Sequence, residues 1–190
     1  GRTLLAVAFA SIALIVTWGA VQWMALWAQE MAGNDVPRAK AYTQVMSAFG
    51  AILGCIGGAW FGGRFGRRPA YFLLCLTSLI AGSILFRGFH SYSGGFLAMA
   101  FVVGGVTAAF YGWLPLYLPE LFPPRVRATA QGLSFNFGRI LAGFGALQMG
   151  TLVNQLGGYA QAGAAIVLIY ILGLFLIWFA PETKGKPLPE

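Results

Sequence analysis

The chain has 190 residues, of which 58% are hydrophobic and 9% are charged, and its formal net charge is +7. Because soluble domains carry about 25% charged residues, this composition leaves too little polar surface to face water and indicates an integral membrane protein. The positive charge does not indicate nucleic-acid binding, since the basic residues stand in short clusters between apolar runs and form no contiguous basic face.

Six apolar runs are long enough to cross a bilayer, whose hydrocarbon core of roughly 30 Å requires about 20 helical residues. The runs are continuous, whereas the strands of a membrane barrel would alternate, so the fold class is predicted to be all-α. A single domain, residues 1–190, is expected to form a polytopic bundle of six transmembrane helices without a soluble domain. The predicted spans are residues 4–28, 43–62, 69–89, 95–118, 128–154 and 159–180.

The first span contains two side chains that suit a binding cavity. Trp18 and Gln22 lie one helical turn apart, so both can face a cavity near the middle of the membrane. Packing or an interfacial position is the alternative for each. The run is too long for a secretory signal and lacks an initiator methionine and a cleavage site, so we interpret it as the first span of a piece of a longer chain.

Basic residues are divided unequally between the two sets of loops, and this division predicts the orientation. Cytoplasmic loops are enriched in Lys and Arg, so the richer side, which holds both ends of the chain, is expected to be cytoplasmic. The expected location is the plasma (cell inner) membrane. The richer side carries Arg2, Arg64, Arg67, Arg68, Arg125, Arg127, Lys184 and Lys186, and the other carries Arg38, Lys40 and Arg87.

Glycine is dense in the second and fifth spans, as in GAILGCIGG at 50–58, and this allows close packing of helices in lipid. Cys55 and Cys75 stand in apolar runs without ligand-spaced partners, so we expect packing residues, no metal and no cofactor. His90 falls in an outer loop, where a surface role is expected. The sequence has no Ser/His/Asp set, carboxylate cluster or phosphate-binding loop, so an enzyme is not expected.

Three motifs resemble the major facilitator superfamily. GGAWFGGRFGRRP (57–69) resembles its signature loop, with Arg64, Gly66, Arg67 and Arg68 in matching positions and Gly63 where the family usually has aspartate. PELFPPRVRATA (119–130) and PETKGKPLPE (181–190) resemble the loop and the tail of the sugar-porter branch. The resemblance implies helices seven to twelve of a twelve-helix transporter. The implied partner is an amino-terminal six-helix half or a second copy.

The motif loops place charges at helix ends on the predicted cytoplasmic side. Glu120, Arg127 and Glu182 can meet the Arg67/Arg68 pair when those helix ends converge, and such pairs would act as a latch between two conformations. A role in membrane topology alone is the alternative for the arginines.

Arg139 is the one cation in the middle of a predicted span. It lies about 16 Å along the fifth span at roughly 1.5 Å per residue, near the bilayer midplane, where a charge is costly. None of the five acidic residues falls within a span, so its counter-charge should come from a substrate anion or from the absent half. Asn136 shares its helical stripe. Bonding to the backbone of a neighbouring helix is the alternative.

The pattern from Tyr111 to Arg139 is similar to that of niacin and aromatic-acid proton symporters. Tyr111 lies one turn from Thr107 and is a further cavity candidate. The leading hypothesis is a secondary transporter, proton-coupled by resemblance, for a small anionic organic solute. A sugar or polyol porter is the alternative, although Gln22 stands alone and Pro115 replaces the tryptophan of sugar porters. A non-transporting membrane scaffold is the alternative of another class.

Overall fold

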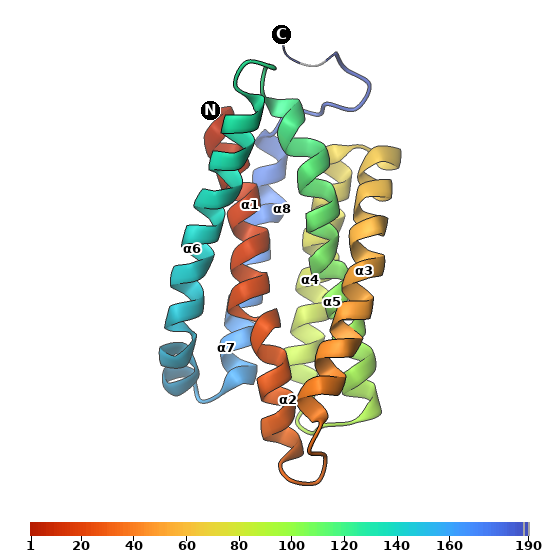
Figure 1. Ribbon diagram of the computed structural model, residues 1–190, viewed down its shortest axis with the longest axis vertical. Helices are drawn as coiled ribbons and strands as arrows, with labels where there is room; N and C mark the ends of the chain where they lie inside the picture. Colours follow the sequence, from red (N-terminus) through yellow and green to blue (C-terminus); the bar gives the residue numbers. More distant parts are fainter. Residues whose placement is uncertain (188, 190) are drawn as a thin grey trace.

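The computed structural model describes residues 1–187 and 189. They form a helical bundle in which the chain runs from one end to the other six times, in alternating directions (Figure 1). The first helix begins at the same end of the bundle at which the last one finishes. The first pass consists of α1 (Arg2–Gly19), η1 (Val21–Trp23) and α2 (Met24–Ala32). The next passes are α3 (Ala39–Phe65), α4 (Arg67–Gly88), α5 (Gly94–Tyr117) with η2 (Leu118–Leu121), and α6 (Arg127–Leu156). The last comprises α7 (Tyr159–Ile166), η3 (Val167–Ile169), α8 (Tyr170–Leu176) and η4 (Ile177–Phe179).

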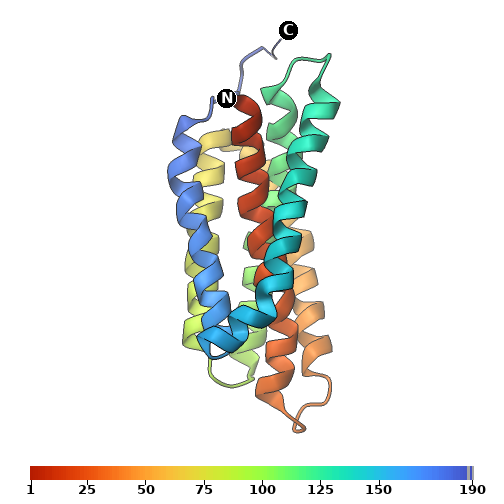
Figure 2. The ribbon, with the colours of Figure 1, turned by 90° about the vertical axis from the view of Figure 1, so that its left-hand side faces the viewer.

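Among the described residues, five helical segments are long and apolar enough to span a membrane: 2–32, 39–65, 67–88, 94–121 and 159–179. This confirms an all-α, multi-pass membrane architecture. The fifth predicted span, residues 128–154, becomes α6, which is long enough but does not reach the same hydropathy. Its polar residues, among them Gln131, Asn136 and Arg139, lower its apolar content. Figures 1 and 2 both place α6 alongside α1, where the two helices pack together.

The first pass is not one continuous helix, although the sequence predicts a single run over 4–28. At Ala20 the backbone departs from α-helical geometry, with φ −123° and ψ −57°, and the 3-10 turn η1 follows. Trp18 therefore belongs to the end of α1 and Gln22 to the turn beyond it. This interruption changes the relative direction of two side chains that a regular helix would stack.

α3 and α5 pack with their backbones in contact because small residues line both helices. A Cβ at Gly54 would overlap the carbonyl oxygen of Gly105, and one at Gly58 would overlap that of Ala109. The same holds on α5, where a Cβ at Gly112 would overlap the carbonyl oxygen of Cys55. The packing role predicted for the glycines of the second span is therefore visible at the α3–α5 contact, as expected for helices in lipid. In the fifth span, by contrast, a Cβ at Gly143 or Gly150 would meet no heavy atom of the described residues within 4 Å.

A cluster of buried aromatic rings fixes the end of the bundle at which the chain begins. Trp113 and Tyr117 of α5 pack against Tyr71 of α4, with ring centroids 4.6 Å apart for Tyr71 and Trp113 and 4.7 Å apart for Trp113 and Tyr117. Phe9 of α1 completes the cluster at 4.8 Å from Tyr71. All four side chains are fully buried, so three helices are held in one relative position here.

Candidate functional site

The α3–α4 connection is a single residue, Gly66, with φ +108° and ψ 163°. Side chains other than hydrogen are strained in this conformation, so glycine is required at the corner. The tight corner makes Arg67 the first residue of α4. The indole Nε1–H of Trp113 donates to the carbonyl oxygen of Arg67 at 3.1 Å, and this ties the corner to the aromatic cluster.

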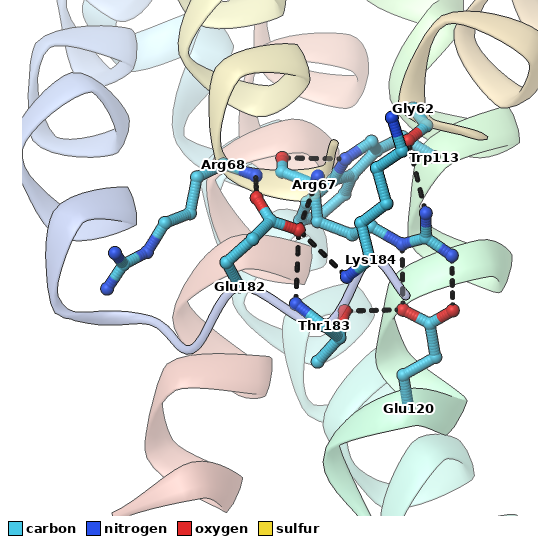
Figure 3. Close-up of polar contacts among 8 residues, drawn as sticks. All are labelled: Gly62, Arg67, Arg68, Trp113, Glu120, Glu182, Thr183 and Lys184. Atoms are coloured by element: carbon cyan, nitrogen blue, oxygen red, sulfur yellow. Dashed lines mark hydrogen bonds and ion pairs between the residues drawn. The ribbon is translucent and has the colours of Figure 1, made fainter. Parts of the chain in front are cut away.

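Arg67 and Glu120 form a two-point ion pair between α4 and η2 (Figure 3). The arginine Nε donates to Oε2 of Glu120 at 2.8 Å, and its Nη2 donates to Oε1. A third donor, Nη1, reaches the carbonyl oxygen of Gly62 at 3.3 Å. The two charged side chains retain 11% and 16% of their surface exposed, so the pair is shielded from water and is stronger than a surface pair.

Glu182 caps the amino-terminal end of α4 from the segment after η4 (Figure 3). Its carboxylate accepts the backbone N–H groups of Arg67 at 3.0 Å and Arg68 at 2.9 Å, and those of Thr183 and Lys184 at 3.0 Å each. The helix dipole also favours a negative charge at this end. Partial burial raises the pKa of Glu182, but the four N–H donors outweigh it, so its pKa lies below the ordinary value.

Thr183 joins the two carboxylates into one network. Its hydroxyl donates to Oε2 of Glu120 at 2.6 Å, while its neighbour Glu182 holds the start of α4. The hydroxyl of Tyr117 donates to the carbonyl oxygen of Pro181 at 2.7 Å and so fixes the same segment from α5. We call Arg67, Arg68, Glu120, Glu182 and Thr183 the charge cluster. The sequence did not single out Thr183, Trp113 or Tyr117, and only the position of Thr183 inside the tail motif pointed to it.

Within the described part of the chain, the other three arginines singled out in the predicted motifs do not bind a carboxylate through their side chains. The Arg68 guanidinium donates to the carbonyl oxygens of Ala180 and Trp178 rather than to a carboxylate. Arg127 donates from Nε to the carbonyl oxygen of Phe122 at 3.2 Å, and its Nη2 is buried without a partner among the described residues. The Arg64 side chain is exposed. Arg67 is therefore the cation that meets Glu120 directly.

Arg139 lies twelve residues into the 30-residue helix α6, and its side chain is exposed. Within residues 1–187 and 189 the one ion pair is that of Arg67 and Glu120, so no carboxylate there neutralises Arg139. Asn136 is exposed on the same helix, and its Nδ2 donates to the carbonyl oxygen of Gly132 at 2.8 Å. The amide oxygen of Asn136 remains available to a ligand.

Two of the remaining cavity candidates lie on helices that meet around α1. Trp18 is at the end of α1, which packs against both α5, the helix of Tyr111, and α6, the helix of Arg139. Trp18 is exposed and Tyr111 is half-buried. Gln22 is separate from them and lines a different cavity of about 250 Å³ together with Lys40 and Gln44. We call Trp18, Tyr111, Asn136 and Arg139 the arginine site.

The "Sugar (and other) transporter" family matches residues 30–190. A "Putative metabolite transport protein" of Haemophilus influenzae is 29% identical over 180 residues, which are 90% of this chain and 41% of that protein. "Low affinity inorganic phosphate transporter 8" of Medicago truncatula is 31% identical over 110 residues, covering 53% of this chain and 20% of that protein. The chain thus spans less than half the length of these relatives.

Solved structures show the same fold. The inward-open conformation of the xylose transporter XylE from E. coli superposes with a TM-score of 0.68 over 95% of this chain and 48% of that one, at 21% identity. A double-tryptophan mutant of XylE gives 0.69 over 97% and 46%, at 19% identity. The chain belongs to the sugar (and other) transporter family of the major facilitator superfamily, whose members are transporters and not enzymes.

Proposed function

We propose that the chain is the carboxyl-terminal six-helix half of a secondary transporter that moves a small anionic organic solute across the plasma membrane by alternating access. The observation that carries this proposal is the exposed Arg139, which lies well inside α6 and has no carboxylate partner among the described residues. An arginine offers a planar fork that binds a carboxylate with two hydrogen bonds. A charge at this depth needs such compensation.

The need for a second half is supported by the surfaces of α3 and α6. Large apolar side chains are exposed on both helices, and the relatives are more than twice as long as the chain. An amino-terminal half, or a second copy of the chain, would cover these faces and enclose the arginine site between two bundles. Examples are Phe49, Ile52 and Ile56 on α3 and Ile140, Phe144 and Leu147 on α6.

The distribution of basic residues supports an orientation with both ends of the chain in the cytoplasm. In this orientation the charge cluster lies at the cytoplasmic end of the half. It forms within one half and needs no contact from the other, so it would keep η2, α4 and the tail together as a rigid unit during rocking. Proton coupling would need a carboxylate from the other half, since Glu120 and Glu182 are both engaged in the cluster.

The anionic solute is favoured over a sugar by Arg139 and by the relative from Medicago truncatula, which is named as a transporter of an anion, inorganic phosphate. A sugar or polyol porter is the second candidate, because the matching solved structures are those of a xylose transporter. A non-transporting scaffold is the third, and the glycine at position 63 of the signature loop is its support.

Uptake by the full-length protein in proteoliposomes tests these candidates. With an inward proton gradient, we expect accumulation of radiolabelled benzoate or nicotinate that unlabelled carboxylates suppress and xylose does not. Uptake of xylose that carboxylates leave unchanged would establish the sugar porter instead. Absence of uptake for both classes, in protein that remains folded and monodisperse, would favour the scaffold.

A further inference from the structure

A long apolar groove lies between α3 and α4, with α5 as its floor. Its volume is about 620 Å³, and its lining is almost entirely carbon. Gly57 and Phe61 line one wall, Leu73 lines the other, and Val106 lies on the floor. The Thr77 hydroxyl in the wall is already used, because it donates to the carbonyl oxygen of Leu73 at 2.7 Å.

The groove matches the depth of one lipid leaflet. Its α3 wall runs from Gly50 to Phe61, which is about 16 Å at roughly 1.5 Å per residue. Half of a hydrocarbon core of about 30 Å is a similar length. The groove also has room to spare, since a Cβ at Gly57 would meet no heavy atom within 4 Å. An extended hydrocarbon chain therefore fits its length and chemistry.

Two cations lie at the end of this groove nearest the α3–α4 corner. Arg64 follows Gly57 and Phe61 on the same face of α3, about one turn beyond the groove, and its side chain is exposed. The Nζ of Lys184 donates to the carbonyl oxygen of Arg64 at 2.6 Å, which brings a second positive charge to the same corner. No carboxylate in residues 1–187 and 189 pairs with either cation, because Glu120 is the one acidic residue there that forms an ion pair.

We propose that this groove binds an acidic phospholipid of the cytoplasmic leaflet, with one acyl chain between α3 and α4 and the phosphate against Arg64 and Lys184. The choice of leaflet rests on the orientation proposed above. The groove is apolar, is as long as one leaflet is deep, and ends at two cations. These features suit a molecule with a hydrocarbon tail and an anionic head. Basic pockets between transmembrane helices on the cytoplasmic side bind anionic head groups in this way.

Native mass spectrometry of the full-length protein, with equal amounts of phosphatidylglycerol and phosphatidylcholine of identical acyl chains, tests the proposal. Gly57→Leu fills the groove, and Arg64→Ala and Lys184→Ala each remove one cation. Gly150→Leu is the matched control for the first change, since a Cβ there also meets no heavy atom within 4 Å. Arg125→Ala removes an exposed cation of the neighbouring loop and controls for the charge changes.

We expect the wild-type protein to retain phosphatidylglycerol in preference to phosphatidylcholine. Loss of one cation should weaken that binding about fivefold, and Gly57→Leu should weaken it at least as much, while both controls keep it. Equal retention of the two lipids would overturn the proposal. The proposal would also be overturned if the two cation variants lost phosphatidylglycerol and Gly57→Leu kept it, because that result indicates attraction to the surface charges without the groove. Absence of bound lipid in the wild type, as expected if the other half covers the groove, would also overturn it.

Discussion

Arg67 and Glu120, which are 53 residues apart in the chain, form the ion pair that connects the start of α4 to η2. Both hydrogen bonds of the pair are directed by the guanidinium fork, and the backbone of Arg67 is held separately by Trp113 and Glu182. The arginine is therefore positioned by its main chain before its side chain binds. This relationship makes the end of the half a rigid unit.

Removal of the Glu120 carboxylate should destabilise the protein. Glu120→Gln leaves a largely buried guanidinium without its counter-charge, which costs about 3 kcal/mol for a shielded pair. Arg67→Lys should cost less, because the charge remains but the two-point geometry is lost. Thermal unfolding of the purified full-length protein measures both effects. Glu30→Gln, in an exposed outer segment, is the control, and an equal loss of stability in the control would contradict this explanation.

Glu182 should make stability depend on pH in the acidic range. Its pKa is depressed in the folded protein, because the backbone N–H donors outweigh the opposite effect of burial. A depressed carboxyl pKa stabilises the fold at pH values above the unfolded pKa of about 4.3, and this contribution is lost as pH falls through the folded pKa. Unfolding curves between pH 6 and pH 3 should show this loss. In Glu182→Gln the free energy of unfolding should fall less steeply as the pH is lowered. An unchanged pH dependence would rule out the cap of α4 as its source.

Gly66 should not tolerate a side chain. An alanine there would need a backbone conformation that only glycine adopts readily, at a cost of order 1–3 kcal/mol. Its Cβ would also lie 3.1 Å from Oε2 of Glu182 and press on the cap of α4. Gly63→Ala is the matched control, because a Cβ at that helical position meets no heavy atom within 4 Å. Comparable unfolding temperatures for the two variants would contradict the requirement for glycine at the corner.

The contact between α3 and α5 should be sensitive to a single methyl group. Gly54→Ala forces the two helices apart, and overpacking of this kind costs typically about 1–3 kcal/mol. Gly57→Ala, three residues away and facing open space, should be neutral or slightly stabilising, since alanine is the better helix former. The difference between the two unfolding temperatures measures the packing effect, and its absence would mean that the helices separate freely.

The sequence was sufficient to predict an all-helical bundle and the loops that carry its charges. Continuous apolar runs predict spans, and short basic loops separate them, so a loop was expected over residues 63–68 where the structure has a single-residue corner at Gly66, while the charges near it were foreseen. The pairing within the cluster was not, because Arg64, Arg67, Arg68 and Arg127 have the same chemistry. Three-dimensional placement decides among them, and here the backbone contacts of Trp113 and Glu182 select Arg67.

Two features of the candidate site depend on tertiary structure in the same way. The interruption at Ala20 comes directly after Gly19 but contains no proline, and the apolar run continues through it, so the sequence predicted one helix with Gln22 one turn from Trp18. The packing of α1 against both α5 and α6, the helices of Tyr111 and Arg139, is likewise something that no local pattern can reveal. The depth of Arg139 could be read directly from the sequence, whereas two acidic residues expected outside the spans, Glu30 and Glu120, fall near the ends of the helical segments 2–32 and 94–121.

The most direct measurement of the proposed role of Arg139 is equilibrium binding of benzoate, nicotinate and xylose to the full-length protein and its variants. We expect carboxylate binding that Arg139→Ala abolishes and Arg139→Lys retains in part, since lysine keeps the charge but not the fork. Arg38→Ala, in the outer loop, should bind as the wild type does. Undiminished carboxylate binding by Arg139→Ala, or binding of xylose alone, would contradict the assignment of Arg139 as the anchor of an anionic solute.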